Sequence, residues 1–273
     1  MNTSATIEFS RHANAFSGSL SLEDVRRRAP AVFAETAHQR TSPTYRFVPS
    51  ERVLAGLMQA GFVPVEARQT RARYDVTHAR HIVRLRRRFE TVQLRDAVPE
   101  VVFLNSHDGT SAYQLRVGIF RVVCTNGLIV SLGAFPSFRV THRGDVVDEV
   151  VSSAVEISER FGVLASRVER MEQTFLPKED QLAFAERALA VRFPDPLQCG
   201  ILPVQLLSCR RVDDLGNDLW SVLNKVQENL LRGGVSRLTQ SGRRIATRRI
   251  SSIREDVRIN CRLWDLAEEV MAG

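Results

Sequence analysis

The sequence predicts an α+β fold, in which an antiparallel sheet packs on a long helix and a C-terminal helical appendage follows. The chain has 273 residues and is 44% hydrophobic, so it can bury a proper core. The spacing of apolar residues shifts towards the strand period between Phe62 and His142, and it returns to the helical period after Gly144. These two shifts separate a sheet from the helices on either side of it.

Two helices are predicted before the sheet. The stretch "SLEDVRRRAP" predicts a short helix that Ser21 caps and Pro30 ends, within an N-terminal arm of residues 1–44. In "RFVPSERVLAGLMQAGF", Ser50 is the expected N-cap and Gly61 the expected stop of a helix with an apolar stripe. This helix opens the predicted sheet domain, residues 45–195.

The sheet is predicted from short β-rich runs separated by turn signals. The predicted strands span about residues 63–71, 79–88, 100–105, 112–123, 127–132 and 137–142. The short turns imply antiparallel pairing, and Asn126-Gly127 is a dipeptide that a tight hairpin favours. In "ARHIVRLRRR" one face is apolar and the other strongly basic, which suits a sheet with one face on the core and one face open.

Helices dominate the rest of the chain. A long helix is predicted from about 145 to 192, with a break near Pro177 because proline lacks a backbone donor. The prolines of "FPDPLQCGILP" then mark a loop. Two further helices, 216–232 and 256–272, form a C-terminal segment of residues 196–273 and are joined by "GGVSRLTQSGRRIATRRISSIR", interpreted as a mobile surface loop.

The segment "NSHDGTSAYQL" brings His107, Asp108 and Ser111 close together in sequence and raises the question of a catalytic triad. In a Ser-His-Asp hydrolase the three groups meet by folding, and neighbours in one short turn do not usually adopt that geometry. Asp-Gly between two β-rich runs is instead a strong hairpin signal. We interpret the segment as a corner in the backbone.

No catalytic residue, metal site or cofactor is predicted. Glycine-rich phosphate loops and the H-E-x-x-H motif are absent, and His78, His81 and Asp75 form only a loose cluster. The four cysteines are interpreted as reduced thiols, with Cys124 as a small buried residue. No run approaches the roughly 18 apolar residues of a membrane span, so we expect a cytoplasmic protein without a membrane partner.

The net charge of +7 comes almost wholly from arginine, and it concentrates in two strips. Eight arginines and one acid lie between Arg68 and Arg88, and seven arginines and no acid lie between Arg232 and Arg254. Such strips raise the local potential for phosphate, although a solvated surface with arginine-rich coding is the plainer alternative. The candidate nucleic-acid-binding residues are Arg71, Arg73, Arg84, Arg86, Arg88, Arg243, Arg244, Arg248 and Arg249.

Several segments resemble one family. They are "FAETAHQRTSPTYRFVPS", "LNSHDGTSAYQL", "FRVVCTNGLIV", "LWSVLNKVQENLLRGG", "SGRRIATRRISSI" and "INCRLWDLAEEVM". In these segments, which extend from about Phe33 to Met271, the chain is similar to the phage/plasmid-like protein family, the domain of unknown function numbered nine-three-two. The resemblance implies a mobile-element context and carries no established activity or catalytic residues.

The leading hypothesis is therefore a phage or plasmid accessory protein that binds nucleic acid, with single-stranded DNA favoured and strand annealing as a further activity. A homo-oligomer is part of this hypothesis, by analogy with ring-forming annealing proteins. The alternative is an antirestriction or other host-defence antagonist that binds a host protein. A DNA-modifying enzyme is a third reading, but the acids Asp75, Asp96, Glu100 and Asp108 are scattered along the sequence.

Overall fold

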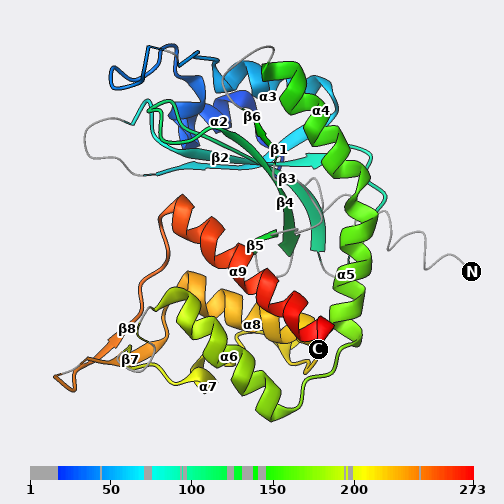
Figure 1. Cartoon of the computed structure of the whole chain (residues 1–273), viewed down its shortest axis with the longest axis vertical. Helices are drawn as coiled ribbons and strands as arrows, with labels where there is room; N and C mark the ends of the chain where they lie inside the picture. Colours follow the sequence, from blue (N-terminus) through cyan, green and yellow to red (C-terminus); the bar gives the residue numbers. More distant parts are fainter. Residues whose placement is uncertain are drawn as a thin grey trace, which may run out of the picture. The chain divides into compact units, whose positions relative to one another are not determined.

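The computed structural model describes residues 18–43, 45–70, 76–92, 94, 97–121, 126–130, 138–140, 146–193, 195, 199–239 and 241–273. The chain divides into two compact units, Met1–Gly162 and Val163–Gly273 (Figure 1). The first unit holds an antiparallel sheet with its covering helices, and the second is mainly helical. The predicted α+β class is confirmed.

The helical elements before the sheet are α2 (Leu22–Arg28), the 3-10 turn η1 (Pro30–Phe33) and α3 (Ser50–Gln59). The predicted cap of the first helix is confirmed, because the Asp24 backbone N–H donates to Ser21 Oγ at 3.1 Å. The predicted cap of α3 was wrong. Pro49 is the N-cap, and Ser50 is the first helical residue, with a buried side chain that bonds to other segments.

Six strands form one antiparallel sheet in the part of the chain that the structure describes. They are β1 (Phe62–Gln69), β2 (His81–Arg87), β3 (Ala97–Asn105), β4 (Tyr113–Arg121), β5 (Asn126–Val130) and β6 (Phe138–Val140). The order is β1-β2-β3-β4-β5, and β6 pairs with β4 as well. The predicted antiparallel sheet is confirmed. Gly127 lies within β5, opposite Phe120, so the tight turn predicted at Asn126-Gly127 was wrong.

Helices α3 and α4 cover one face of this sheet (Figure 1). α4 (Val146–Glu159) contacts β3, β4, β6 and α3, and it buries Val146, Val150, Ala154 and Ile157 along one helical face. A helix therefore packs on the sheet, as predicted. It is shorter than expected, because α4 ends at Glu159 and a separate helix begins two residues later.

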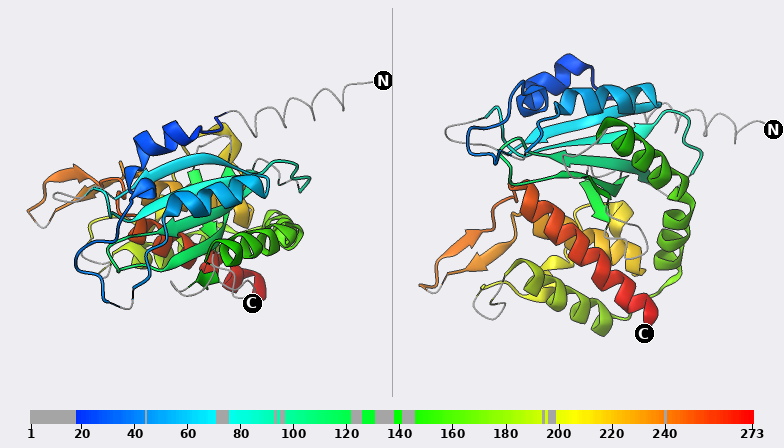
Figure 2. Two further views of the ribbon diagram at one scale, coloured as in Figure 1. Left: turned by 90° about the horizontal axis from the view of Figure 1, so that it is seen from above. Right: turned by 45° about the horizontal axis from the view of Figure 1, so that its top comes forward.

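The second unit is built from helices and a small ribbon of two strands (Figure 2). Its elements are α5 (Phe161–Gln173), which begins at the unit boundary, α6 (Lys178–Arg192), α7 (Pro203–Leu206), the 3-10 turn η2 (Val212–Asp214), α8 (Leu219–Arg232), β7 (Ser236–Leu238), β8 (Arg244–Ala246) and α9 (Ile253–Ala272). Helices α6, α8 and α9 contact one another, and the two predicted C-terminal helices are confirmed as α8 and α9. Among the described residues, no helix combines the length and apolar character needed to cross a membrane.

Helix α8 is buried along most of its length. It buries apolar residues such as Trp220, Leu223 and Val226. It also buries polar side chains, and each of these polar side chains has a hydrogen-bond partner. The buried polar residues of α8 are Ser221, Asn224, Lys225, Gln227, Glu228 and Asn229. The helix thus combines core packing with a polar network that reaches the neighbouring segments.

Candidate nucleic-acid interface

The first arginine strip does not form the open basic surface that the sequence predicted. Arg71 and Arg73 lie outside the described residues. Arg84 and Arg86, on β2, are only 2% and 4% exposed, so their assignment to a nucleic-acid surface was wrong. Arg88, just beyond the end of β2, is exposed.

The physical reason is a buried carboxylate on the neighbouring strand. Glu100, on β3, is fully buried and accepts a hydrogen bond from Arg84 Nη1 and another from Arg86 Nε, each at 2.9 Å. Glu66 Oε2, on β1, lies 3.5 Å from Arg84 Nε. The Arg86 guanidinium also stands 4.6 Å from the centroid of the Phe120 ring. A desolvated charge is tolerated only with such partners.

Sequence reasoning placed Glu100 among scattered acids and missed this pairing. The available signal was an acid in the middle of the apolar run "VPEVVFLN", because a carboxylate in a buried strand needs a cationic partner. β2 alternates arginines with apolar residues, and β3 lies next to it in the sheet. The register then brings Arg84 opposite Val102, within reach of Glu100.

The second strip, by contrast, lies on the surface, but it is not the loop that the sequence suggested. Strands β7 and β8 pair as an antiparallel ribbon (Figure 2). We call these two strands, the described residues between them and the segment that continues to Arg249 the arginine ribbon. The tip closes through Thr239 N–H to Arg243 O and Gly242 N–H to Thr239 O, both 2.9 Å. The candidates Arg243, Arg244, Arg248 and Arg249 are all exposed.

The two faces of the arginine ribbon differ. The cross-strand partners are Ser236 with Ala246, Arg237 with Ile245, and Leu238 with Arg244. Cross-strand partners share a face. One face of the ribbon therefore carries Leu238 and Arg244 together with the small residues Ser236 and Ala246, and the other face carries Arg237 and Ile245. On the first, Leu238 is 53% exposed and Arg244 and Ala246 are exposed, so we call it the open face. Arg237 and Ile245 are half-buried.

Charged side chains fix the base of the arginine ribbon to the helices of the second unit. Arg192, the last residue of α6, donates to the carbonyls of Leu230 and Arg248. Arg210 donates to Gly233 O at 2.6 Å and to Asn229 Oδ1 at 2.9 Å. These bonds occupy carbonyls where α8 ends and the ribbon begins, so they set the direction in which the ribbon leaves the helix.

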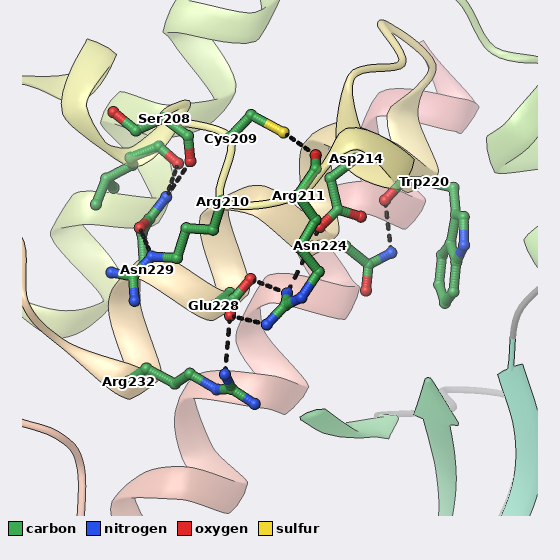
Figure 3. Close-up of polar contacts among 11 residues, drawn as sticks. Ser208, Cys209, Arg210, Arg211, Asp214, Trp220, Asn224, Glu228, Asn229 and Arg232 are labelled. Carbon is green, nitrogen blue, oxygen red and sulfur yellow. Dashed lines mark hydrogen bonds and ion pairs between the residues drawn. The ribbon is translucent and has the colours of Figure 1, made fainter. Parts of the chain in front are cut away.

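Arg210 belongs to a loop that a polar cluster holds on α8 (Figure 3). Glu228 is almost fully buried, and its two carboxylate oxygens accept hydrogen bonds from Arg211 Nη1 at 2.5 Å and Arg211 Nη2 at 2.8 Å. Arg232 Nη1 lies 3.2 Å from the same carboxylate. Asn229 Nδ2 donates to the Leu206 and Ser208 carbonyls at 2.9 Å. The motif "QENLLRGG" thus supplies the side chains that brace the ribbon base.

The arginine ribbon concentrates positive charge on the surface of the second unit. Within the described part of the chain, none of the ribbon's arginine side chains has a carboxylate oxygen within 4.0 Å. At the base, burial lowers the pKa of the Arg192 guanidinium, and the positive charge of Arg237 lowers it further. Like charges are therefore held near each other, and a polyanion would relieve their repulsion.

The segment around His107 is a corner, as the sequence predicted. Asp108 Oδ1 accepts from the Thr110 N–H at 2.9 Å and from Ser106 Oγ at 2.6 Å, and Gly109 has a φ of +80°. Burial works against ionisation of Asp108, but these hydrogen bonds outweigh it and lower the carboxyl pKa. Ser111 Oγ donates to Ala112 O, so it does not pair with His107.

His107 itself takes part in a buried polar cluster that the sequence did not predict. Ser50 Oγ lies 3.0 Å from His107 Nε2, 2.9 Å from His81 Nε2 and 3.0 Å from Asn105 Nδ2. His81 Nδ1 lies 3.0 Å from Ala79 O, and because a carbonyl only accepts, His81 Nε2 accepts from Ser50. Burial lowers the pKa of His81 to about 4. All four side chains are fully buried, which favours a structural role.

The remaining polar candidates form no further site among the described residues. His78 Nε2 lies 3.0 Å from Thr36 O, and no group of His, Cys, Asp or Glu suited to a metal ion occurs there. Cys199, Cys209 and Cys261 are free thiols, and Cys124 and Asp75 lie outside the described residues.

Comparison with known proteins supplies the family. The family described as domain of unknown function (DUF932) matches residues 37–264. The chain is similar to two Escherichia coli (strain K12) proteins, UPF0380 protein YafZ and UPF0380 protein YfjQ. Each is 39% identical over 254 residues, which cover 92% of this chain and 92% of the relative. No solved structure matches the chain. The motifs quoted above predicted this assignment, and the chain belongs to the DUF932 family.

Proposed function

We propose that this protein binds nucleic acid through the arginine ribbon, as an accessory protein of phages or plasmids. One observation carries the proposal: Arg243, Arg244, Arg248 and Arg249 are exposed on an anchored two-stranded ribbon and have no carboxylate partner among the described residues. Ordinary solvated surfaces mix both signs of charge. A one-sign ribbon instead attracts a polyanion.

Arginine suits this role because its planar guanidinium donates two parallel hydrogen bonds to a phosphate. Each phosphate that the ribbon neutralises would also release condensed counterions, which makes binding favourable at low salt. Because Arg192 and Arg210 hold the ribbon base, the ribbon is ordered before it meets its partner. Less conformational entropy is then lost on binding than in a loop that orders only on contact.

The proposal moves the binding surface away from the sheet. Binding of a single strand on the basic face of the sheet, with the annealing that it would allow, needs Arg84 and Arg86 at the surface. Both are buried with Glu100. The ribbon alone supports binding, so annealing is not part of the proposal. Action on nucleic acid of a phage or plasmid also fits a cytoplasmic protein.

Fluorescence anisotropy with labelled DNA tests the proposal, at about 50 and 200 mM salt. The variant changes Arg243, Arg244, Arg248 and Arg249 to Gln. Its matched control changes four exposed arginines of the first unit to Gln, namely Arg28, Arg40, Arg46 and Arg52. Both variants lose four positive charges, so a difference between them reports the location of the charge rather than its total.

We expect the ribbon variant to bind more weakly and with a flatter salt dependence than wild type. The log-log slope should fall by about 0.9 unit for each phosphate that the variant no longer neutralises on a duplex, and by about 0.7 on a single strand. The control should bind like wild type, and both variants should keep the wild-type Tm. Wild-type binding by the ribbon variant, or no binding by wild type at low salt, would contradict the proposal and favour a host protein as partner.

A further inference from the structure

The shape and composition of the arginine ribbon point to one form of nucleic acid. We infer that its open face enters the major groove of duplex DNA, with Leu238 and Ala246 towards the base edges and Arg244 and Arg248 towards the phosphates. This inference rests on the proposed function. It differs from the single-stranded DNA that the sequence analysis favoured.

The paired strands β7 and β8 suit the width of the major groove, with the β8 edge leading, because the β7 edge is bonded to Gly200 O and Gln205 Nε2. Neighbouring strands lie about 4.8 Å apart, and the major groove of B-DNA, about 12 Å wide, admits a two-stranded ribbon with its side chains. The minor groove, about 6 Å wide, does not admit it without deformation of the DNA. The major groove of duplex RNA is deep and narrow, so the ribbon would not reach its bases.

The composition of the ribbon argues against single strands. Proteins that hold single-stranded DNA without sequence preference stack its bases on aromatic side chains. The segment from Arg232 to Arg254 contains no aromatic residue. A single strand would therefore gain only phosphate contacts from the ribbon, without the stacking that favours it over a duplex.

The open face also has an apolar component that phosphate binding does not explain. Leu238 is 53% exposed and lies opposite Arg244, while Ser236 and Ala246 beside them are small enough for close approach. In the major groove, thymine presents a methyl group that apolar side chains contact. Leu238 would contact such methyl groups.

Arginines flank this apolar centre along β8 and its extension. Pairing continues beyond β8, because Thr247 N–H donates to Val235 O at 2.9 Å. Alternation in an extended strand then places Arg248 on the same side as Arg244 and Ala246. The open face thus carries two exposed arginines with small residues between them, an arrangement that lets the guanidinium groups diverge towards the groove walls.

The experiment compares three labelled probes of one sequence in the anisotropy assay: a 30-base-pair DNA duplex, the corresponding single strand and the RNA duplex. Its variant is Leu238→Ala, and the matched control is Leu215→Ala, which truncates a leucine 64% exposed outside the ribbon. Displacement by methyl green, which occupies the major groove, is compared with displacement by netropsin, which occupies the minor groove.

We expect wild type to bind duplex DNA more tightly than the other two probes. Leu238→Ala should weaken duplex binding roughly fivefold without changing the salt slope, because it removes an apolar contact of about 1 kcal/mol and no charge. Leu215→Ala should bind like wild type. Methyl green should displace the duplex from the protein, and netropsin should not.

The inference is overturned if the single strand or the RNA duplex binds as tightly as duplex DNA. Displacement by netropsin alone, or unchanged duplex affinity in Leu238→Ala, would also overturn it. Each of these results leaves the proposed function standing, provided the four-arginine variant still loses affinity. A failure of the proposed function gives a different result, because the four-arginine variant would then bind every probe as tightly as wild type.

Discussion

Arg84 Nη1 on β2 lies 2.9 Å from Glu100 Oε2 on β3, and both side chains are buried. The sequence predicted Arg84 on an open basic surface, but its charge lies inside the first unit, paired with Glu100. Arg86 binds the other oxygen of the same carboxylate, so one acid compensates two arginines, with Glu66 near the first. The sheet therefore contains a charged centre whose members depend on one another.

Removing one member should strongly destabilise the fold. Arg84→Met leaves Glu100 buried with one of its two cationic partners missing, and breaking a buried pair in this way costs about 3–5 kcal/mol. Chemical denaturation of the variant measures this loss. Arg88→Met, at an exposed position just beyond the same strand, should cost less than about 0.5 kcal/mol. Equal stability of the two variants would show that the buried pair is not required.

A methyl group at Gly127, on β5, should also destabilise the fold, because it would disturb the same pair of Arg84 and Glu100. A Cβ there would overlap the Arg84 guanidinium, so Gly127→Ala forces Arg84 away from Glu100 or moves β5. We expect a loss of about 1–3 kcal/mol, typical of an overpacked core. Gly162→Ala is the control, because a Cβ at that position meets no atom within 4 Å. A Tm unchanged in Gly127→Ala would contradict the close packing of this glycine on Arg84.

Acid should destabilise the protein through His81. Its pKa is lowered to about 4, whereas an unfolded histidine titrates near 6.5. The unfolded state then binds a proton that the folded state does not, so the free energy of unfolding falls as the pH drops from about 6.5 to 4, by up to about 3 kcal/mol. Urea denaturation across this range measures the slope, and His81→Asn should flatten it. A profile equally steep in His81→Asn would assign the acid sensitivity to other groups.

Arg210 should act on binding through the position of the ribbon. Arg210→Gln removes the bond to Gly233 O but changes no residue of the open face. We expect weaker duplex binding with an unchanged salt slope, together with faster hydrogen exchange at Thr247 and Ile250, whose N–H groups bond to Val235 and Leu231. A slope reduced by about one unit would mean that Arg210 itself contacts a phosphate.

Local patterns were sufficient to predict the strands of the large sheet and most helices. Alternation in "ARHIVRLRRR" predicted a strand over 79–88, and the structure has β2 at His81–Arg87. The turn chemistry of Asp108-Gly109 predicted a corner that the structure contains. Each of these features is decided by neighbours in sequence, because strand period and turn conformation are local properties of the chain.

Features that depend on distant partners were not predicted. Glu100 follows Arg84 by 16 positions, and only the register of β2 on β3 makes them neighbours. Ser50 was expected to cap α3, but His81 and Asn105 compete successfully for its hydroxyl. The arginine ribbon escaped prediction for another reason. Its strands have three residues each, too few to show a period.

The order of the strands in the sheet has a consequence for how the protein is made. Through β5, each strand pairs with the strand synthesised just before it. Loop closure between successive strands is inexpensive, and such a low contact order favours fast folding. The sheet can then grow from β1 while the rest of the chain is still on the ribosome, at about 5–20 residues per second. Because Gly127 of β5 packs on Arg84, the burial of that guanidinium is completed only when β5 joins the sheet.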